Sequence, residues 1–212
     1  GVDVINFSIS GSRTNFRDSV EIAFLFAADA GVFVAASAGN SGPTSSTVAH
    51  PGPWLTTVAA GTHNRDGVGS VTLGNGASYT GASVATPVGP APLIDSVVAG
   101  VAGAAPADVE LCVPGTLDPA LVVGKIVICK RGVIARVDKS LAVQTAGGVG
   151  MIMYNSPNSS LNADFHFVPT VHVDQASGLA VKAYAATPGA TAAINASTIV
   201  FNAPAPFTAS FS

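Results

Sequence analysis

The apolar residues at the start of the chain fall into two kinds of pattern. Residues 2–9 form a nearly continuous apolar run, which is typical of a buried parallel strand. Apolar residues then recur at helical spacing between positions 20 and 27, and Gly31 is the expected end of that helix. Further buried strands are predicted for residues 32–36 and 55–60. Strand, helix and strand in this order predict a βαβ unit in a parallel sheet.

The pattern changes after residue 73, where short apolar runs alternate with turn signals. Three prolines predict a loop over residues 81–92. Further along, the strand candidates are residues 125–129, 150–154 and 170–173, and the helix candidates are residues 136–146 and 176–186. These elements predict a second module of the α/β or α+β class with a core of its own.

Composition narrows the classes of protein that the chain can represent. Only 10% of the 212 residues are charged and the net charge is −3, whereas an average soluble protein has about 25% charged residues. This excludes charge-driven disorder and argues against nucleic acid as a partner. Hydrophobic residues make up 48% of the chain, but no apolar run reaches the ~18 residues of a membrane-spanning helix. The chain opens directly in a strand pattern, which we expect of a segment of a longer protein.

Residues 36–43 carry the first candidate chemistry. They follow a predicted parallel strand, and open α/β sheets place their functional sites at the carboxyl ends of strands. The side-chain amide of Asn40 can donate to a developing negative charge, or it can cap an ordinary turn. Cys112 and Cys129 are too few for a structural zinc site, and the residues leave open one disulfide or two buried thiols.

Four segments in sequence order resemble the subtilisin-like serine peptidases, or subtilases. The sequence SAGNSGP at residues 37–43 is similar to their oxyanion-hole segment, and VDVINFSISG at residues 2–11 is similar to their substrate-binding strand. Residues 17–30 resemble the helix between those strands, and PWLTTVAA at residues 53–60 resembles the next strand. The resemblance implies part of a parallel-sheet catalytic domain.

The middle of the chain resembles the protease-associated (PA) domain, which subtilases carry as an insert before their nucleophile segment. The similar stretches are LCVPGTLDP at residues 111–119, VGKIVICKRG at 123–132, KSLAVQTAGGVGMIM at 139–153 and VPTVHV at 168–173. The last residues, 203–212, resemble the return into the catalytic domain. The implied fold is α/β: a partial subtilase domain over residues 1–76, an inserted β-rich PA domain over 77–200 and a return strand over 201–212.

The resemblance assigns roles residue by residue. Among the catalytic residues of the family, only an oxyanion-hole donor is matched here, by Asn40. The expected substrate-binding residues are Ser8, Ile9 and Ser10 in the cleft strand and Ser37, Ala38 and Gly39 in the pocket for the residue before the scissile bond. Ser10 departs from the usual glycine of the family, which puts the substrate preference in doubt. Subtilases order their triad Asp, His, Ser, so we expect the triad outside this chain and the segment alone to be inactive.

Other residues are expected to be structural. The motif GASVATP at residues 81–87 resembles the nucleophile segment, but that serine opens a long helix, which nearby prolines would break at about 3 kcal/mol each. It also precedes the insert, so we interpret it as a decoy. The histidines His50, His63, His166 and His172 are expected to be loop or strand residues. The basic residues Lys125, Lys130, Arg131, Arg136 and Lys139 predict a solvated rim, with binding of a peptide or partner as the alternative.

The expected function is therefore that of a secreted serine endopeptidase acting on peptides or proteins. The alternative is a PA domain that binds proteins or forms a homodimer without catalysis; subtilase-like flanks argue against an exopeptidase or receptor origin. A secreted parent makes a Cys112–Cys129 disulfide the expected pairing, at about 3 kcal/mol. No cofactor or metal site is identified, and calcium is considered for the parent only. Asn158 and Asn195 begin glycosylation sequons in form.

Overall fold

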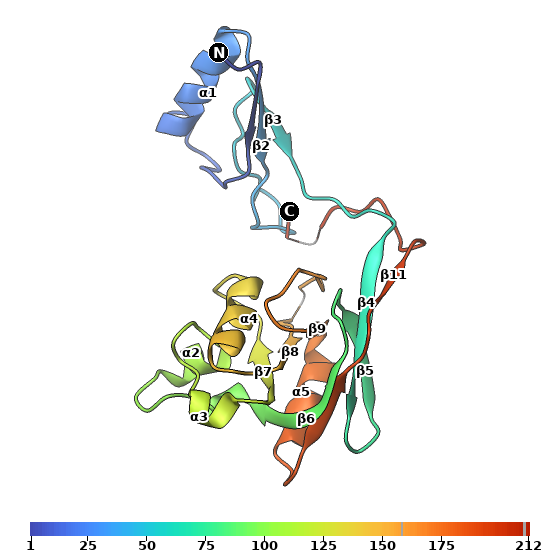
Figure 1. Cartoon of the computed structure of the whole chain (residues 1–212). Coiled ribbons are helices and arrows are strands. Elements are labelled where there is room, and N and C mark those ends of the chain that lie inside the picture. The colour runs from blue at the N-terminus through green and yellow to red at the C-terminus, as the bar shows by residue number, and fades with distance from the viewer. Residues whose placement is uncertain (158, 210) are drawn as a thin grey trace. The chain divides into compact units, whose positions relative to one another are not determined.

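The computed structural model describes residues 1–157, 159–209 and 211–212 (Figure 1). The chain forms two compact units, one of residues 1–64 and 204–212 and the other of residues 65–203. The expected boundaries after residues 76 and 200 differ from these because strand β4 (Asp66–Leu73) pairs entirely with strands of the second unit. Asn158 and Ser210, which belong to a sequon and to the expected return strand, lie outside the described residues.

The first unit is a parallel sheet with one helix. Its elements are β1 (Val4–Phe7), α1 (Ser19–Asp29), β2 (Phe33–Ser37) and β3 (Thr56–Val58), with sheet order β1-β2-β3 among the described residues. Both strand pairs are parallel, so the predicted βαβ unit is confirmed. The side chain of Asp18 caps α1 by accepting the Val20 N–H at 2.9 Å. The closing segment returns here, since Thr62 N–H donates to the Phe207 carbonyl and Ala209 N–H to the Ala60 carbonyl.

The second unit is rich in strands. Its further strands are β5 (Ser78–Ala82), β6 (Val88–Asp95), β7 (Ile126–Lys130), β8 (Gly150–Tyr154), β9 (Thr170–Val173), β10 (Thr191–Ile194) and β11 (Thr198–Val200). Its helices are η1 (Ser96–Val98), α2 (Pro106–Glu110), α3 (Pro119–Val122), α4 (Arg136–Thr145) and α5 (Gln175–Ala185). The strand order within the described residues is β10-β6-β7-β8-β9-β5-β4-β11, and β10 also pairs with β4. Seven strands therefore close into a barrel, with β11 added beside β4.

Alternate residues of the central strands face two separate cores. Ile126 and Ile128 of β7 pack in one cluster with Val181 of α5, while Val127 and Cys129 pack in another with Val143 of α4. Strands buried on both faces read as continuous apolar runs, which is why residues 125–129, 150–154 and 170–173 were predictable. The helices predicted near residues 136–146 and 176–186 are also confirmed.

Strand β6 corrects the expectation of a loop over residues 81–92. Its prolines are tolerated because the pairing is irregular there: β6 pairs with β10 through Ala91 and Pro92, and the register shifts before the next pair, Val88 with Ile194. Regular parallel pairing with β7 begins only at Leu93. No helix among the described residues is long and apolar enough to cross a membrane.

Candidate functional site

The carboxyl ends of β1 and β2 bring the expected cleft residues together. Phe7 is in register with Ala36 in this parallel pair, so Ser8 and Ser37 leave the sheet at the same end. The two segments then approach closely: a Cβ added to Gly39 would lie 3.2 Å from the Ser10 Oγ. Gly39 also has φ of 85°, a conformation that side chains rarely adopt. The local backbone therefore requires glycine at this position.

The individual residues of this end differ in exposure. Asn40, Ser8, Ile9 and Ser10 are exposed residues. Ala38 is buried; its N–H donates to the Val58 carbonyl, and its carbonyl accepts the Ala49 N–H, both at 2.9 Å. The Ser37 hydroxyl accepts the Gly39 N–H at 3.1 Å. These bonds fix the turn that leads to Asn40 without using the Asn40 side chain.

A buried acid–histidine pair lies directly beneath this end of the sheet. The His50 Nδ1 is 2.5 Å from the Glu21 Oε1, and the two side chains are 1% and 0% exposed. The other ring nitrogen, Nε2, is 2.9 Å from the Ile9 carbonyl oxygen. The ring packs edge-on against Phe7 and Phe24. The pair thus links helix α1 to the cleft segment through apolar surroundings.

Two nearby glycines leave the space that the Glu21 and His50 side chains occupy. A Cβ on Gly11 would lie 2.2 Å from the His50 ring, and a Cβ on Gly52 would lie 2.8 Å from the Glu21 Oε2. His50 itself has φ of 52°, which costs a non-glycine residue about 1 kcal/mol. The Thr57 hydroxyl donates to the His50 carbonyl at 2.6 Å and holds it there.

Sequence reasoning missed Glu21 and treated His50 as an ordinary loop histidine. One signal was available, since Glu21 precedes Phe24 by three residues and therefore shares its face of the helix. A carboxylate on a core-facing stripe needs a buried partner. The partner lies 29 positions away, and the sequence alone does not identify it.

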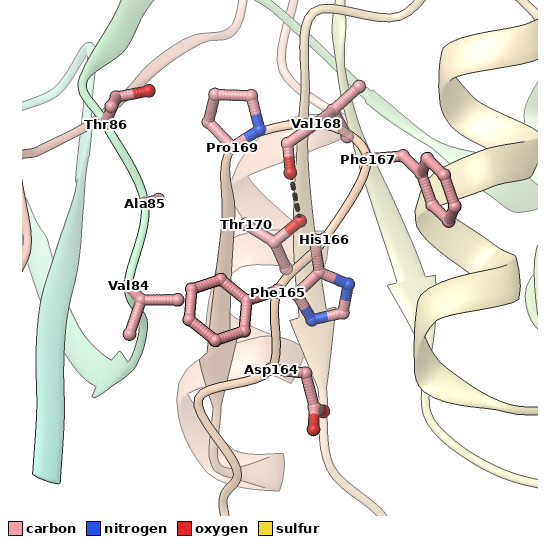
Figure 2. A pocket seen from close by; sticks show the side chains of 10 residues that line it. All are labelled: Val84, Ala85, Thr86, Asp164, Phe165, His166, Phe167, Val168, Pro169 and Thr170. Atoms are coloured by element: carbon pink, nitrogen blue, oxygen red, sulfur yellow. Dashed lines mark hydrogen bonds between the residues drawn. The ribbon is translucent and has the colours of Figure 1, made fainter.

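The second unit contains a cavity of about 280 Å³ (Figure 2). It is lined by residues 84–86 and 164–170, with the aromatic ring of Phe165 between Val84 and His166 in the view. Phe165 is 86% exposed, so its ring forms an open wall. The polar residues are Asp164, which pairs with the Arg136 guanidinium, and His166, whose Nδ1 is 3.0 Å from the Ser140 Oγ.

Burial and neighbouring charges shift the pKa values of the titratable groups beside this cavity. Burial raises the pKa of Asp164, but its hydrogen bonds to Arg136 outweigh burial and lower the pKa overall. Burial lowers the pKa of His166, and it lowers that of the fully buried His172 to about 4. His172 accepts the Asn162 N–H at Nδ1 and contacts the Asn155 Oδ1 through Nε2. It is a neutral structural histidine at physiological pH.

The serine of the decoy motif is structural. Ser83 is 1% exposed, its hydroxyl donates to the Thr170 carbonyl at 2.7 Å, and it accepts the Ala85 N–H at 3.0 Å. No helix follows it within residues 83–87. This geometry supports the interpretation of residues 81–87 as a decoy.

The expected basic rim needs a correction. Lys139 is fully buried and donates to the Leu111 carbonyl at 2.7 Å, so it is not a solvated residue. Lys130 pairs with Glu110 at 3.0 Å. Glu110 also accepts from the Tyr154 hydroxyl at 2.6 Å and from Lys182 at 3.2 Å. Part of the basic stretch therefore stabilises the second unit from within.

Two further expectations concern cysteines and metals. Cys112 and Cys129 form a disulfide beside the second core cluster. Within the described part of the chain, no group of three or more His, Cys, Asp or Glu residues could hold a metal ion. The Asn195 side-chain nitrogen donates to the hydroxyls of Ser70 and Thr72, so this sequon asparagine is engaged within the fold.

Comparison with known proteins places these observations in a family context. The PA domain family matches residues 91–181, within the barrel. Subtilisin-like protease SBT1.7 of Arabidopsis thaliana is 41% identical over all of this chain and 28% of its own length, and SBT1.6 of the same plant is 42% identical over all of the chain and 29% of its own. The protease Apa1 of Pseudoalteromonas sp. AS-11, a solved structure, aligns with 98% of this chain and 56% of its own at 18% identity and a TM-score of 0.42.

The chain therefore contains a PA domain, and the β-rich second unit is consistent with that domain. The resemblance of the chain to a segment of the subtilisin-like peptidase family with an inserted PA domain is confirmed. The chain spans a little over a quarter of the length of these relatives.

Proposed function

We propose that the first unit is the substrate-cleft part of a subtilisin-like serine endopeptidase, supplied with its triad by other parts of the full-length protein. The observation that supports this most directly is the convergence of the Ser8–Ser10 and Ser37–Asn40 segments at one end of a parallel sheet. Relatives along the whole chain are named subtilisin-like proteases. A peptide would lie along the Ser8–Ser10 segment that continues β1, the strand at one edge of the sheet among the described residues.

In this proposal Asn40 is the oxyanion donor. Its amide is exposed just beyond β2, and the turn that carries it is fixed by backbone hydrogen bonds. When a serine hydroxyl attacks a peptide carbonyl, the carbonyl oxygen becomes negatively charged, and a fixed N–H donor stabilises that charge more than the ground state. The serine, its histidine base and the aspartate that orients the base come from outside this chain.

Replacement of Asn40 by leucine in the full-length protein tests the assignment. Leucine is similar in size but cannot donate, so kcat should fall about 10²–10³-fold, a magnitude taken from subtilisin itself, with little change in KM. Asn40→Asp is a second test variant: it keeps the shape and its ionised carboxylate cannot donate, so kcat should fall here as well. A large drop in melting temperature with turnover per folded molecule retained would instead make Asn40 a structural residue.

The compartment and partners follow from the same proposal. The Cys112–Cys129 disulfide favours an oxidising environment, so we propose a secreted protein that acts on peptides or proteins. The second candidate function is protein binding by the PA domain, including binding of a second copy. It is favoured by Phe165, which is 86% exposed and lines the cavity in Figure 2. Analytical ultracentrifugation of the wild-type chain and of Phe165→Ser tests this candidate.

A further inference from the structure

We infer that Glu21 and His50 are positioning residues for the substrate-binding edge: they hold the Ile9 carbonyl inward so that the backbone groups of Ser8 and Ser10 face a bound peptide. The inference rests on the proposed peptidase function. It concerns residues that do not touch the peptide themselves, since both side chains are buried.

The direction of the backbone supports this role. The Asp3 carbonyl accepts the Phe33 N–H at 2.9 Å, so odd-numbered residues of β1 direct their polar groups toward β2. In a parallel strand, the backbone N–H and C=O groups of one residue point toward one neighbouring strand, and those of the next residue point toward the opposite edge. Past the end of β1 the chain bends at Ile9, and the His50 hydrogen bond keeps the Ile9 carbonyl on the inner side. By the same alternation, the backbone N–H and C=O groups of Ser8 and Ser10 point away from β2, toward the edge where a peptide would bind.

The protonation of the pair follows from its partners. A carbonyl oxygen can only accept, so the His50 Nε2 must carry a proton to bind Ile9. The contact between Nδ1 and the Glu21 Oε1 at 2.5 Å then needs a second proton, carried either by Nδ1 or by the carboxyl oxygen. Glu21 thereby orients the ring and keeps Nε2 a donor. The Trp54 indole N–H donates to the Glu21 carbonyl at 3.0 Å and fixes this turn of α1.

A purely structural account does not require this arrangement. Apolar residues of similar volume usually replace a buried ionic pair with little loss of stability. The site instead leaves the Glu21 Oε2 without a hydrogen-bond partner among the described residues and holds His50 at positive φ. Such costs are typical of functional sites. What this arrangement provides is a hydrogen-bond donor for the Ile9 carbonyl.

The central test uses the double variant Glu21→Leu/His50→Phe in the full-length protein. The two apolar side chains can fill the space between Phe7 and Phe24 but cannot bind the Ile9 carbonyl. We expect a melting temperature close to wild type and faster hydrogen exchange over residues 8–12. We also expect KM to rise about tenfold for peptides extended on the amino-terminal side of the scissile bond, as one lost hydrogen bond would cause. A single-residue ester, which does not reach this edge, should change far less.

Three further variants keep the test decisive. Glu21→Gln should retain a near wild-type KM because its amide can donate to Nδ1 and leave Nε2 protonated. Gly11→Ala should reproduce the KM increase, because the added Cβ displaces the His50 ring. Val34→Ala, a core change on the same sheet, should lower the melting temperature without changing KM.

Each outcome bears on one proposal. If the double variant and Gly11→Ala both fold and show wild-type KM and wild-type exchange at residues 8–12, the positioning role is wrong. If the double variant does not fold, Gly11→Ala alone decides. If the wild-type protein hydrolyses no peptide, the peptidase proposal fails, while the exchange measurement still decides whether the pair holds the Ser8–Ser10 segment.

Discussion

The two units bury very different amounts of apolar side chain. Within the described residues, the core cluster of the first unit has three buried members, Phe24, Val34 and Ala36, whereas the second unit has two clusters of thirteen each. The first unit also exposes large apolar side chains: Val4 is 60% exposed, Phe26 67% and Phe33 55%. We therefore expect the unit that carries the candidate cleft to have little stability of its own and the barrel to fold independently.

The largest effect should appear when the two units are produced separately. A chain of residues 65–203 should unfold cooperatively, because its barrel is closed and both faces of its central strands are covered. Residues 1–64 should show no cooperative transition, since five buried apolar side chains, the three of the cluster with Ala38 and Ala49, cannot offset the entropy of ordering the chain. Thermal melting followed by circular dichroism measures both. A cooperative transition for residues 1–64 would contradict the expected difference in stability between the two units.

The exposed apolar surface of the first unit has a consequence for the whole chain. We expect the 212-residue chain to self-associate through this unit, and residues 65–203 to remain monomeric unless the PA domain itself binds a second copy. Light scattering at high concentration compares the two. Phe33→Ser should reduce the association, because the side chain is 55% exposed and its loss removes little core. A monodisperse, monomeric full chain would contradict this expectation.

Removal of the disulfide should be the largest single change within the barrel. Cys112→Ala/Cys129→Ala opens a loop that joins residues 17 apart, and the loss should be about 3 kcal/mol. For a unit of this size that corresponds to a drop in melting temperature of roughly 10 °C. The measurement is a melt of residues 65–203 with and without the substitutions. Two thiols that alkylate in the native, unreduced protein would show that no disulfide forms.

The same contrast explains which features could be predicted from sequence. Strands β7 and β8 were recognisable because both faces are buried and every residue is apolar or nearly so. Strand β6 was not, because Pro90 and Pro92 read as a loop and only the irregular pairing with β10 accommodates them. The local sequence pattern is enough to predict β7 and β8, whereas β6 depends on its pairing with a strand distant in the sequence.

Buried charge was the least predictable feature. Lys139 and Glu21 are both 0% exposed, although charged residues are almost never fully buried unless paired. Their partners, the Leu111 carbonyl and His50, are 28 and 29 positions away. Asn40 was identified from the motif SAGNSGP, whereas in the buried pair the helix pattern marks Glu21 alone and does not identify His50 as its partner. The assignment of Asn40 stays a prediction until its activity is measured.

An acid-sensitive network should distinguish the barrel from the first unit at low pH. Burial raises the pKa of Glu110, but hydrogen bonds from Tyr154, Lys130 and Lys182 outweigh burial and lower it to about 2 from 4.5. Because the unfolded chain binds this proton first, stability should be full above about pH 4.5 and should fall as the pH drops toward 2. Glu110→Gln should cost about 1–2 kcal/mol at pH 7 and flatten this dependence. Urea titrations of residues 65–203 at pH 7 and pH 3 measure it, and parallel curves for the two proteins would contradict the role of Glu110.

The smallest expected effect concerns Lys139 at alkaline pH. Burial lowers the pKa of Lys139 to about 8 from 10.5, so between these values the unfolded chain binds more protons than the folded one. Stability should therefore rise with pH from about 8 to 10.5 and stay constant with respect to this group below pH 8. Lys139→Met keeps the length of the side chain but loses both the titrating amine and its hydrogen bond to the Leu111 carbonyl, at a cost on the order of 1 kcal/mol. Since other groups of the barrel also titrate here, the informative quantity is the difference in unfolding free energy between the variant and wild type. That difference should grow between pH 7.5 and pH 10 in the barrel, and a constant difference would mean that the buried amine titrates alike in the folded and unfolded chain.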